Sequence, residues 1–206
     1  MPPVARGCCI SDERADIIKV MRVNPLWLFG LGMLPMLSFA AGARVCVEAE
    51  SAAVVEAPMI KVARAEAAAT NKPVSGASGD VYLEIPEGSG NPPALTAGKA
   101  VLSLDIPSEG SYILWCRVYW EGECSNSFNV QIDNRPVFIL GEDATFKTWH
   151  WVRYPVARTA APIILAQGTH TFSFINREDG VRIDQVLVSA DRRFVPVDTE
   201  PVGSWP

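Results

Sequence analysis

Histidine and cysteine are scarce in this chain of 206 residues, which has two histidines and five cysteines. No Cys-x-x-Cys pair and no Cys/His cluster occurs, so the sequence offers no zinc site of the usual kind. Cys8 and Cys9 precede residues 21–43, which we interpret as a secretory signal. Three cysteines remain, so at most one disulfide can form within the domain. Cys116 and Cys124 flank a strand end and a turn, which suits a bridge; in the alternative, all three are small buried apolar residues.

The sequence also lacks the short motifs of common enzyme classes. It has no Gly-x-Ser-x-Gly elbow, no His-Glu-x-x-His pair, no Walker loop and no Gly-x-Gly-x-x-Gly. We predict structural roles for His150, which lies between two tryptophans, and for His170, which begins a strand and bridges backbone groups. Carboxylates are numerous enough to leave a glycosidase pair open, although no pattern singles one out. We therefore expect a chain that is not an enzyme.

Positive charge is in short supply as well. The net charge is −5, and the acidic excess lies within residues 44–206. This balance argues against a nucleic-acid partner and against docking on an anionic membrane. An acidic, aromatic-bearing domain suits neutral ligands or cations.

Residues 21–43 have the composition of a secretory signal. One positive charge precedes an apolar stretch of roughly 15 residues that ends in small residues. The stretch is shorter than the roughly 20 residues needed to cross a bilayer, and two prolines interrupt it. We expect a start at Met21, cleavage after Ala40 or Ala43, and a protein that is secreted, periplasmic or on the cell surface, with no membrane contact after cleavage. A retained membrane anchor is the alternative.

After the signal, the chain reads as short strands joined by turn residues. The clearest is 99–106, where Ala100, Leu102, Leu104 and Ile106 alternate with other residues. Many short strands without a long helical period predict an all-β sandwich of the jelly-roll type. We assign 1–43 to an N-terminal extension and signal, 44–190 to the sandwich and 191–206 to an irregular tail. Strands are expected at 45–50, 59–64, 81–85, 99–106, 111–120, 127–132, 136–140, 150–156, 163–166, 169–175 and 181–188.

A pair of acids opens the first strand. Glu48 and Glu50 are two apart, so in a strand both carboxylates point to one side. Two such groups repel unless a cation or hydrogen-bond donors separate them, and calcium accepts oxygens at about 2.3–2.6 Å. The alternative is an exposed strand face with two solvated acids.

Aromatic residues are concentrated near strand ends. Flat rings with a polar handle suit stacking on sugars, although half or more of them are expected to fill the core, as we assign Trp115. Trp149 and Trp151 are two apart, so their rings share one side of a strand and His150 takes the other. We expect Trp149 to be solvent-accessible, with Tyr82 or Trp120 and the loop 176–178 beside it. The set of rings is Tyr82, Tyr119, Trp120, Trp149, Trp151 and Tyr154.

The succession of segments resembles carbohydrate-binding modules of families six and thirty-five. Five segments carry the resemblance in order: VEAES (47–51), SGASGDVYLEIP (75–86), LDIPSEGSY (104–112), SFNVQID (127–133) and LAQGTHTF (165–172). A sixth, REDGVRIDQV (177–186), resembles the closing strand of a related group of bacterial exported domains. The resemblance covers nearly all of the chain after the signal, and it implies a galactose-binding-like β-sandwich.

The resemblance also implies two sites. A structural calcium would be held by Glu48, Glu50 and Asp184. A sugar would bind at loops of one end, where the nearest equivalents of the family's aromatic and amide residues are Tyr82, Trp149, Trp151 and Asn176, with Trp120 added from the aromatic pattern.

One loop departs from the family pattern. Asn176, Arg177 and Glu178 replace the usual context of the closing-loop asparagine. They either bind the sugar or pin the loop.

These observations predict an exported, non-catalytic domain that binds a poly- or oligosaccharide through loop aromatics, with a structural calcium. A structural or adhesive module that contacts other exported proteins is the alternative. A small polysaccharide-degrading enzyme is a third reading.

Overall fold

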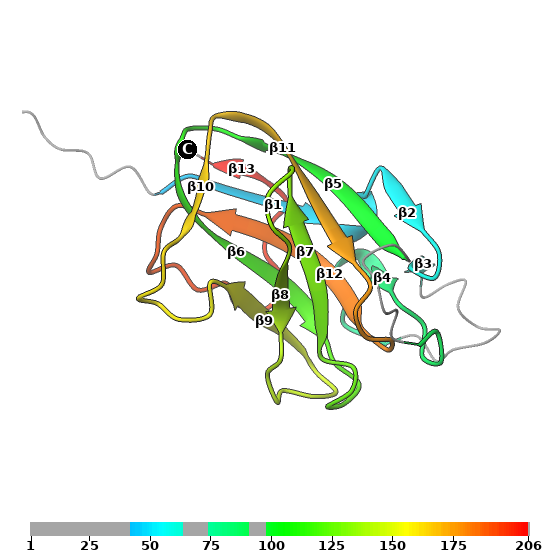
Figure 1. The fold of residues 1–206 in the computed structure, drawn as a ribbon. Helices are drawn as coiled ribbons and strands as arrows, with labels where there is room; N and C mark the ends of the chain where they lie inside the picture. Colours follow the sequence, from blue (N-terminus) through cyan, green and yellow to red (C-terminus); the bar gives the residue numbers. More distant parts are fainter. Residues whose placement is uncertain (1–41, 64–73, 91–97, 206) are drawn as a thin grey trace, which may run out of the picture. The chain divides into compact units, whose positions relative to one another are not determined.

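Short strands separated by turns make up nearly all of the regular structure, as the sequence predicts (Figure 1). The computed structural model describes residues 42–63, 74–90 and 98–205, so the predicted signal lies almost wholly outside the described residues. No helix in these ranges is long and apolar enough to cross a membrane. The elements are β1 (Arg44–Glu48), η1 (Ala49–Ser51), β2 (Val54–Glu56), β3 (Ile60–Ala63), η3 (Ser78–Asp80), β4 (Val81–Glu84), β5 (Lys99–Ile106), β6 (Gly110–Tyr119), β7 (Ser127–Ile132), β8 (Phe138–Gly141), β9 (Trp149–Tyr154), β10 (Ile163–Leu165), β11 (Gly168–Ile175), β12 (Arg182–Ser189) and β13 (Gly203–Trp205).

The strands form two antiparallel sheets. The larger has the order β10-β6-β12-β1-β13, with β9 paired to β6, β4 to β12 and β3 to β4. The smaller has the order β2-β5-β11-β7-β8. Their inner faces enclose one hydrophobic core, which confirms the predicted all-β sandwich of jelly-roll type.

Strand β5 shows why the sequence pattern was informative. Leu102, Leu104 and Ile106 are buried in the core, whereas Ser103 and Asp105 between them are exposed. Alternate side chains of a strand point to opposite faces, so one face of β5 meets the other sheet and one meets water.

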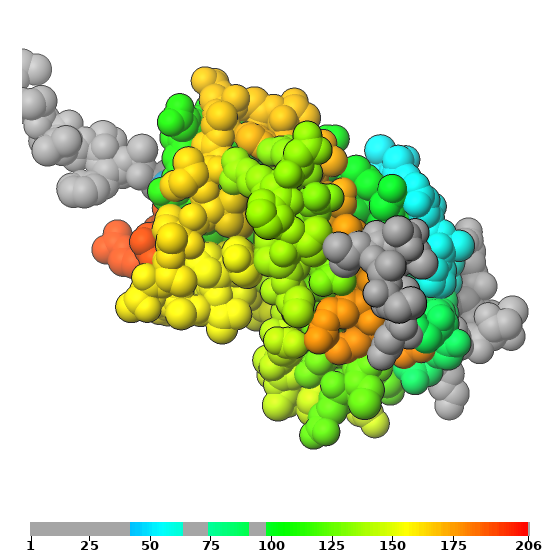
Figure 2. All heavy atoms as spheres, in the orientation of Figure 1, coloured from blue at the N-terminus to red at the C-terminus, as the bar shows by residue number. Residues whose placement is uncertain are grey.

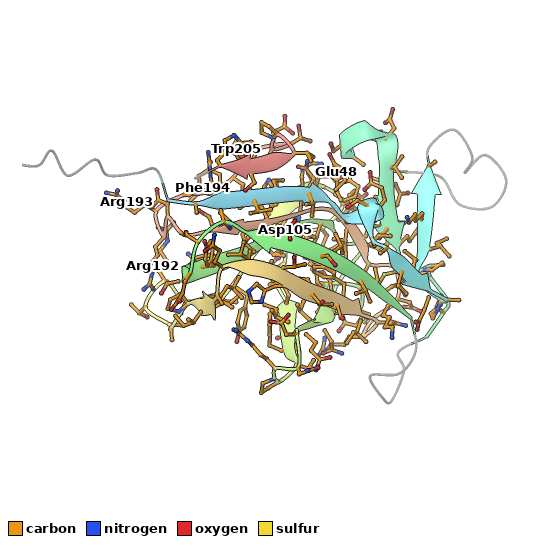
Figure 3. The ribbon with its side chains drawn as sticks, turned by 90° about the horizontal axis from the view of Figure 1, so that it is seen from above. Glu48, Asp105, Arg192, Arg193, Phe194 and Trp205 are labelled. Atoms are coloured by element: carbon orange, nitrogen blue, oxygen red, sulfur yellow. The ribbon has the colours of Figure 1, made fainter. Side chains whose placement is uncertain are left out.

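The outer face of the larger sheet is also covered. Every residue of β12 is buried, and a second apolar cluster on this face contains Cys46, Ile113, Trp115 and Leu187. The residues after β12 turn back over it, and Phe194 and Trp205 pack against the cluster. Figure 3 shows β13, with Trp205, running beside β1. The prediction of an irregular tail holds for residues 191–202, which contain no strand or helix. It missed β13 and the packing of the tail on the outer face of the sheet.

Cysteine serves packing rather than cross-linking here. Cys46 and Cys116 are buried free thiols, and Cys124 is free and exposed. Burial, with a smaller effect of the Glu48 charge, raises the pKa of the Cys46 thiol to about 12. The possible bridge between Cys116 and Cys124 does not form, because Cys116 points into the core.

Candidate functional site

Four side chains form a row across the outer face of the larger sheet, at the end where β9 begins. The strand register places Trp149 of β9 opposite Tyr119 of β6, Tyr119 opposite Arg182 of β12, and Arg182 opposite Glu84 of β4. We call this set the outer-face row. Each member of the row contacts the next. The Trp149 and Tyr119 ring centroids are 5.6 Å apart, and the Arg182 guanidinium carbon lies 5.1 Å from the Tyr119 centroid. The row thus joins two aromatic rings to a charged pair.

The loop before β4 holds Trp149 in place. The indole Nε1 donates to the Ser75 carbonyl oxygen at 3.0 Å, and the Tyr82 ring lies edge-on at 5.6 Å. Gly76 has a φ of +91° and passes so close that an added Cβ would lie 3.4 Å from the indole. Trp149 is consequently half-buried, with its orientation set by the loop, and Tyr82 lies beside it as predicted. Tyr82 itself is buried and uses its hydroxyl to accept the Val74 N–H.

At the charged end of the row, Arg182 contacts a buried acid of the row, Glu84, and a half-exposed acid outside it, Glu121. Arg182 pairs with the buried Glu84 at 3.1 Å and with the half-exposed Glu121 at 2.9 Å. Burial raises the pKa of Glu84 despite the opposing effect of Arg182. Burial also disfavours the Arg182 charge, but the hydrogen bond to Glu121 and the charge of Glu84 outweigh it and raise the pKa of Arg182. The guanidinium therefore stays charged between its acids and behind the Tyr119 ring.

Trp120 was predicted as a ligand residue, and the structure places it elsewhere. It follows Tyr119 in β6, so its side chain points to the opposite face and is fully buried in the core. The indole Nε1 donates to Asp143 at 3.1 Å. Trp120 cannot form part of an exposed sugar platform.

Trp151 shares a side of β9 with Trp149, as predicted, and His150 takes the other side beside Trp120. The indole of Trp151 donates to the Asp198 carbonyl oxygen at 2.8 Å and packs on the tail. The tail therefore covers part of the Trp151 ring.

The loop after β11 is clamped from within. Arg177 contacts the Ser127 hydroxyl, pairs with Glu178 at 2.5 Å and reaches Glu142 at 3.1 Å. The second Glu178 oxygen accepts the Asn126 N–H at 2.9 Å. Of the two readings left open for Arg177 and Glu178, these contacts favour the pinned loop.

Asn176 makes fewer side-chain contacts than Arg177 and Glu178. It is 2% exposed, and its amide oxygen has no hydrogen-bond partner among the described residues. No described contact joins the loop 176–178 to Trp149. The predicted grouping of that loop with Trp149 is therefore not seen in these contacts.

The predicted calcium ligands lie around the end of β1. The strand ends at Glu48, and Glu50 lies in the helical turn η1, so the prediction that both share a strand face is wrong. Asp184 is fully buried at a bulge of β12 and accepts the Ser78 N–H at 2.8 Å. Its other oxygen meets the Arg117 guanidinium at 2.5 Å, so a protein cation already balances this carboxylate.

The two glutamates differ from Asp184 in having unused oxygens. Glu48 Oε1 accepts hydrogen bonds from Ser78 and Gln185 at 2.6 and 3.2 Å. The Oε2 atoms of Glu48 and Glu50 are buried without a hydrogen-bond partner in the described part of the chain. Burying a carboxylate oxygen unpaired is costly, and a bound cation would relieve that cost.

The raised pKa values of two of these acids show that their negative charge is not fully balanced. Burial, together with the charges of Glu48 and Asp184, raises the pKa of Glu50 to about 7. Burial also raises the pKa of Asp184 to about 6, against the opposing effect of Arg117. Within the described ranges, no three His, Cys, Asp or Glu side chains converge as metal ligands. Glu48 and Glu50 are therefore the candidate ligands of a cation through their unpaired oxygens, whereas Asp184 is paired with Arg117.

Sequence reasoning missed Arg117, Arg182 and Glu84. Arg117 and Arg182 sit in strands whose residues are buried on both faces, so no alternation of apolar and polar residues marks them. The one available signal was Arg117, a charged side chain inside a largely apolar strand, which requires a partner.

No family model and no curated protein matches the chain. Among solved structures, the chain is similar to a β-(1,4)-mannanase of Podospora anserina described as GH26-CBM35, with a TM-score of 0.53 and 19% identity over 77% of this chain and 30% of that one. It is also similar to the C-terminal CBM6 of LamC from Zobellia galactanivorans, with a TM-score of 0.48 and 16% identity over 71% of this chain and 98% of that module. A family 35 carbohydrate binding module from Clostridium thermocellum gives a TM-score of 0.48 and 18% identity over 70% and 96% of the two chains. The chain spans less than a third of the mannanase, and at this identity the likeness shows only that the matched part has a similar fold.

Proposed function

We propose that this protein is an exported, non-catalytic carbohydrate-binding domain, and that its ligand rests against the outer-face row. The observation that carries the proposal is the pairing of two half-exposed rings, Trp149 and Tyr119, with the charged groups of Arg182 and Glu121 at the end of one sheet. The apolar C–H faces of a sugar pack on aromatic rings, and its hydroxyls bond to carboxylates and guanidinium groups. Export rests on the composition of residues 21–43.

The charged groups of the row suit binding better than catalysis. Glycoside hydrolysis needs two carboxyl groups that act separately, one as acid and one as base or nucleophile. Glu84 and Glu121 both pair with Arg182, so one cation engages both carboxylates and neither is free to act separately. A pair held in this way positions hydroxyl groups but does not shuttle protons.

The test is binding by the purified protein to an array of plant, algal and host glycans. Trp149→Ala and Tyr119→Ala should each weaken binding of the best ligand at least about tenfold, or about 1.4 kcal/mol. Trp205→Ala is the matched control, because it removes a half-buried tryptophan that packs on the tail cluster and should lower only the melting temperature.

Two outcomes would contradict the proposal. If no glycan binds, or if both row variants bind like the wild type, the row is not a sugar site. Release of reducing sugar from any bound polysaccharide would show that the domain is an enzyme.

Calcium is the second part of the proposal. Glu48 and Glu50 would hold the ion through their buried Oε2 atoms, where it would supply positive charge and tie β1 to η1. A ligand that binds only the folded state stabilises it by about 2.7 kcal/mol at a hundredfold excess over its Kd. Melting in calcium and in chelator should therefore differ by several degrees for the wild type.

The variant Glu50→Gln separates the ion from packing. It should lose the calcium response, and in chelator it should melt above the wild type, because it removes the repulsion among Glu50, Glu48 and Asp184. Glu56→Gln, at an exposed acid paired with Lys99, is the control and should keep the response. A wild type without a calcium response, or an unchanged response in Glu50→Gln, would refute the calcium site.

A further inference from the structure

Arginine side chains gather on the outer face of the larger sheet, away from the outer-face row. Arg153 comes from β9, Arg158 from the β9–β10 connection and Arg192 from the segment after β12; we call these three the arginine cluster. Arg192 Nη2 donates to the carbonyl oxygens of Arg158 and Ala160 at 2.6 and 3.1 Å, which fixes it against the connection. Figure 2 shows the orange-red atoms that follow β12 beside the yellow atoms of this connection. Figure 3 shows Arg192 at the opposite end of β1 from Glu48.

The cluster holds like charges without a neutralising acid. Burial lowers the pKa of Arg153, and the charges of Arg158 and Arg192 lower it further. No ion pair between described residues involves any of the three. The acid nearest in sequence, Asp191, accepts the backbone N–H of Arg193 at 2.9 Å and lies 3.7 Å from its guanidinium. In a chain with a net charge of −5, this is a local concentration of uncompensated positive charge.

The side chain of Arg153 is held in place by an aromatic ring. Its guanidinium carbon lies 5.4 Å from the Trp115 ring centroid, and its Nε is buried without a hydrogen-bond partner among the described residues. Stacking on a ring leaves the guanidinium edge available, and that edge matches a carboxylate or sulfate in a two-pronged hydrogen bond.

A hollow of about 270 Å³ is bordered by one member of the cluster, Arg153. Trp151, Val152 and Val156 give it apolar walls, and Thr145, His150 and Arg153 give it polar ones. Asp143 also borders the hollow, but its carboxylate already accepts hydrogen bonds from Trp120 and the Thr145 N–H and contacts His150. A ring-shaped, hydroxyl-bearing group would fit such walls, with its anionic substituent toward Arg153.

We propose that the arginine cluster and this hollow form a second binding site, which takes a carboxylate- or sulfate-bearing unit of an acidic polysaccharide. The carbohydrate part of this inference rests on the proposed function, whereas the preference for an anion rests on the cluster alone. The acidic surface elsewhere disfavours nucleic acid, whose dense charge would be repelled outside the small cluster.

The test compares binding of the full chain to polygalacturonate, dextran sulfate and uncharged dextran by affinity electrophoresis at low and moderate salt. The carboxylate and sulfate polymers distinguish the two anion sources. Binding to one or both should exceed binding to dextran and weaken as salt rises. Arg158→Ala and Arg192→Ala should each weaken it about tenfold, the loss of one charge-assisted hydrogen bond.

Arg135→Ala is the matched control, because Arg135 is an exposed arginine in the β7–β8 turn, outside the cluster, and its removal should change binding less than twofold. Melting curves check folding, since Arg192 also bonds to backbone carbonyls, and Arg158→Ala removes no described side-chain hydrogen bond. Unchanged binding by both cluster variants would overturn the proposal. The proposal would also be overturned if polyglutamate and duplex DNA bound as tightly as the anionic polysaccharides. Such a result would show charge attraction without sugar recognition.

The experiments distinguish failure of this second site from failure of the proposed sugar site at the outer-face row. If Trp149→Ala abolishes binding of a neutral glycan while no anionic polymer binds, the second site fails and the proposed function stands. If anionic polymers bind through Arg158 while no neutral glycan responds to Trp149→Ala, the arginine cluster stands and the row fails.

Discussion

At the scale of single residues, neighbours in sequence have opposite roles. Tyr119 lies on the outer face in the row, and Trp120, the next residue, is sealed in the core. The buried indole needs a hydrogen-bond acceptor, and Asp143 supplies it. Asp143 also lies 3.1 Å from His150, whose other ring nitrogen faces the Thr148 carbonyl oxygen. One loop carboxylate thus satisfies several groups at the edge of the sandwich.

The first prediction follows from the charge of Asp143. Burial alone would raise its pKa, but the Thr145 N–H, the Trp120 indole and His150 outweigh burial and lower it. A lowered pKa in the folded state stabilises the protein above the unfolded value near 3.8, and this stabilisation is lost as pH falls through the folded value. Asp143→Asn should therefore lower the free energy of unfolding by about 1–2 kcal/mol at pH 7.

The measurement is urea unfolding at pH 7 and at about pH 3, where the gap between wild type and variant should shrink as the wild-type carboxylate is protonated. Glu123→Gln, at an exposed acid, should show no gap at either pH. A gap that stays constant with pH would mean that shape, not charge, is what Asp143 contributes.

At the scale of elements, the sequence is informative where a strand has one wet and one dry face. Alternation in β5 and the shared side of Trp149 and Trp151 in β9 were predicted correctly, because side chains two apart in a strand must point the same way. Strand β6 is different. Ile113 and Trp115 on its outer face are as deeply buried as Leu114 and Cys116 on its inner face, so its residues carry no mark of which face an aromatic side chain takes.

The candidate sites were harder to predict than the strands because their partners come from distant elements. Asp184 was placed with Glu48 on grounds of family resemblance, yet its cation is Arg117, 67 residues earlier in the chain. Glu50 leaves the strand face because the chain turns into η1 directly after Glu48, which buries Ala49. Neither the ion pair nor the turn has a local sequence signal.

At the scale of the whole molecule, the larger sheet packs on both of its faces. The inner face meets the smaller sheet, and the outer face meets the residues that follow β12. Gln185 exchanges hydrogen bonds with the Glu200 backbone at 2.9 Å in both directions, which fastens this segment to β12. The segment was predicted to be irregular because of its prolines and glycine, whereas its contacts come from single residues such as Phe194 and Trp205.

The last prediction tests whether this second layer contributes to global stability. Phe194 packs on the outer cluster, and the Arg44 guanidinium carbon lies 4.3 Å from its ring centroid. A fully buried Phe→Ala change costs about 3–5 kcal/mol, and this half-buried ring should cost about 2 kcal/mol. Phe194→Ala should therefore lower the melting temperature by about 4–8 °C. Val197→Ala, at a valine of the same segment that is 74% exposed, should melt like the wild type. If Phe194→Ala also melts like the wild type, the segment after β12 lies on the sheet without stabilising it, because the outer cluster then stays folded without its cover.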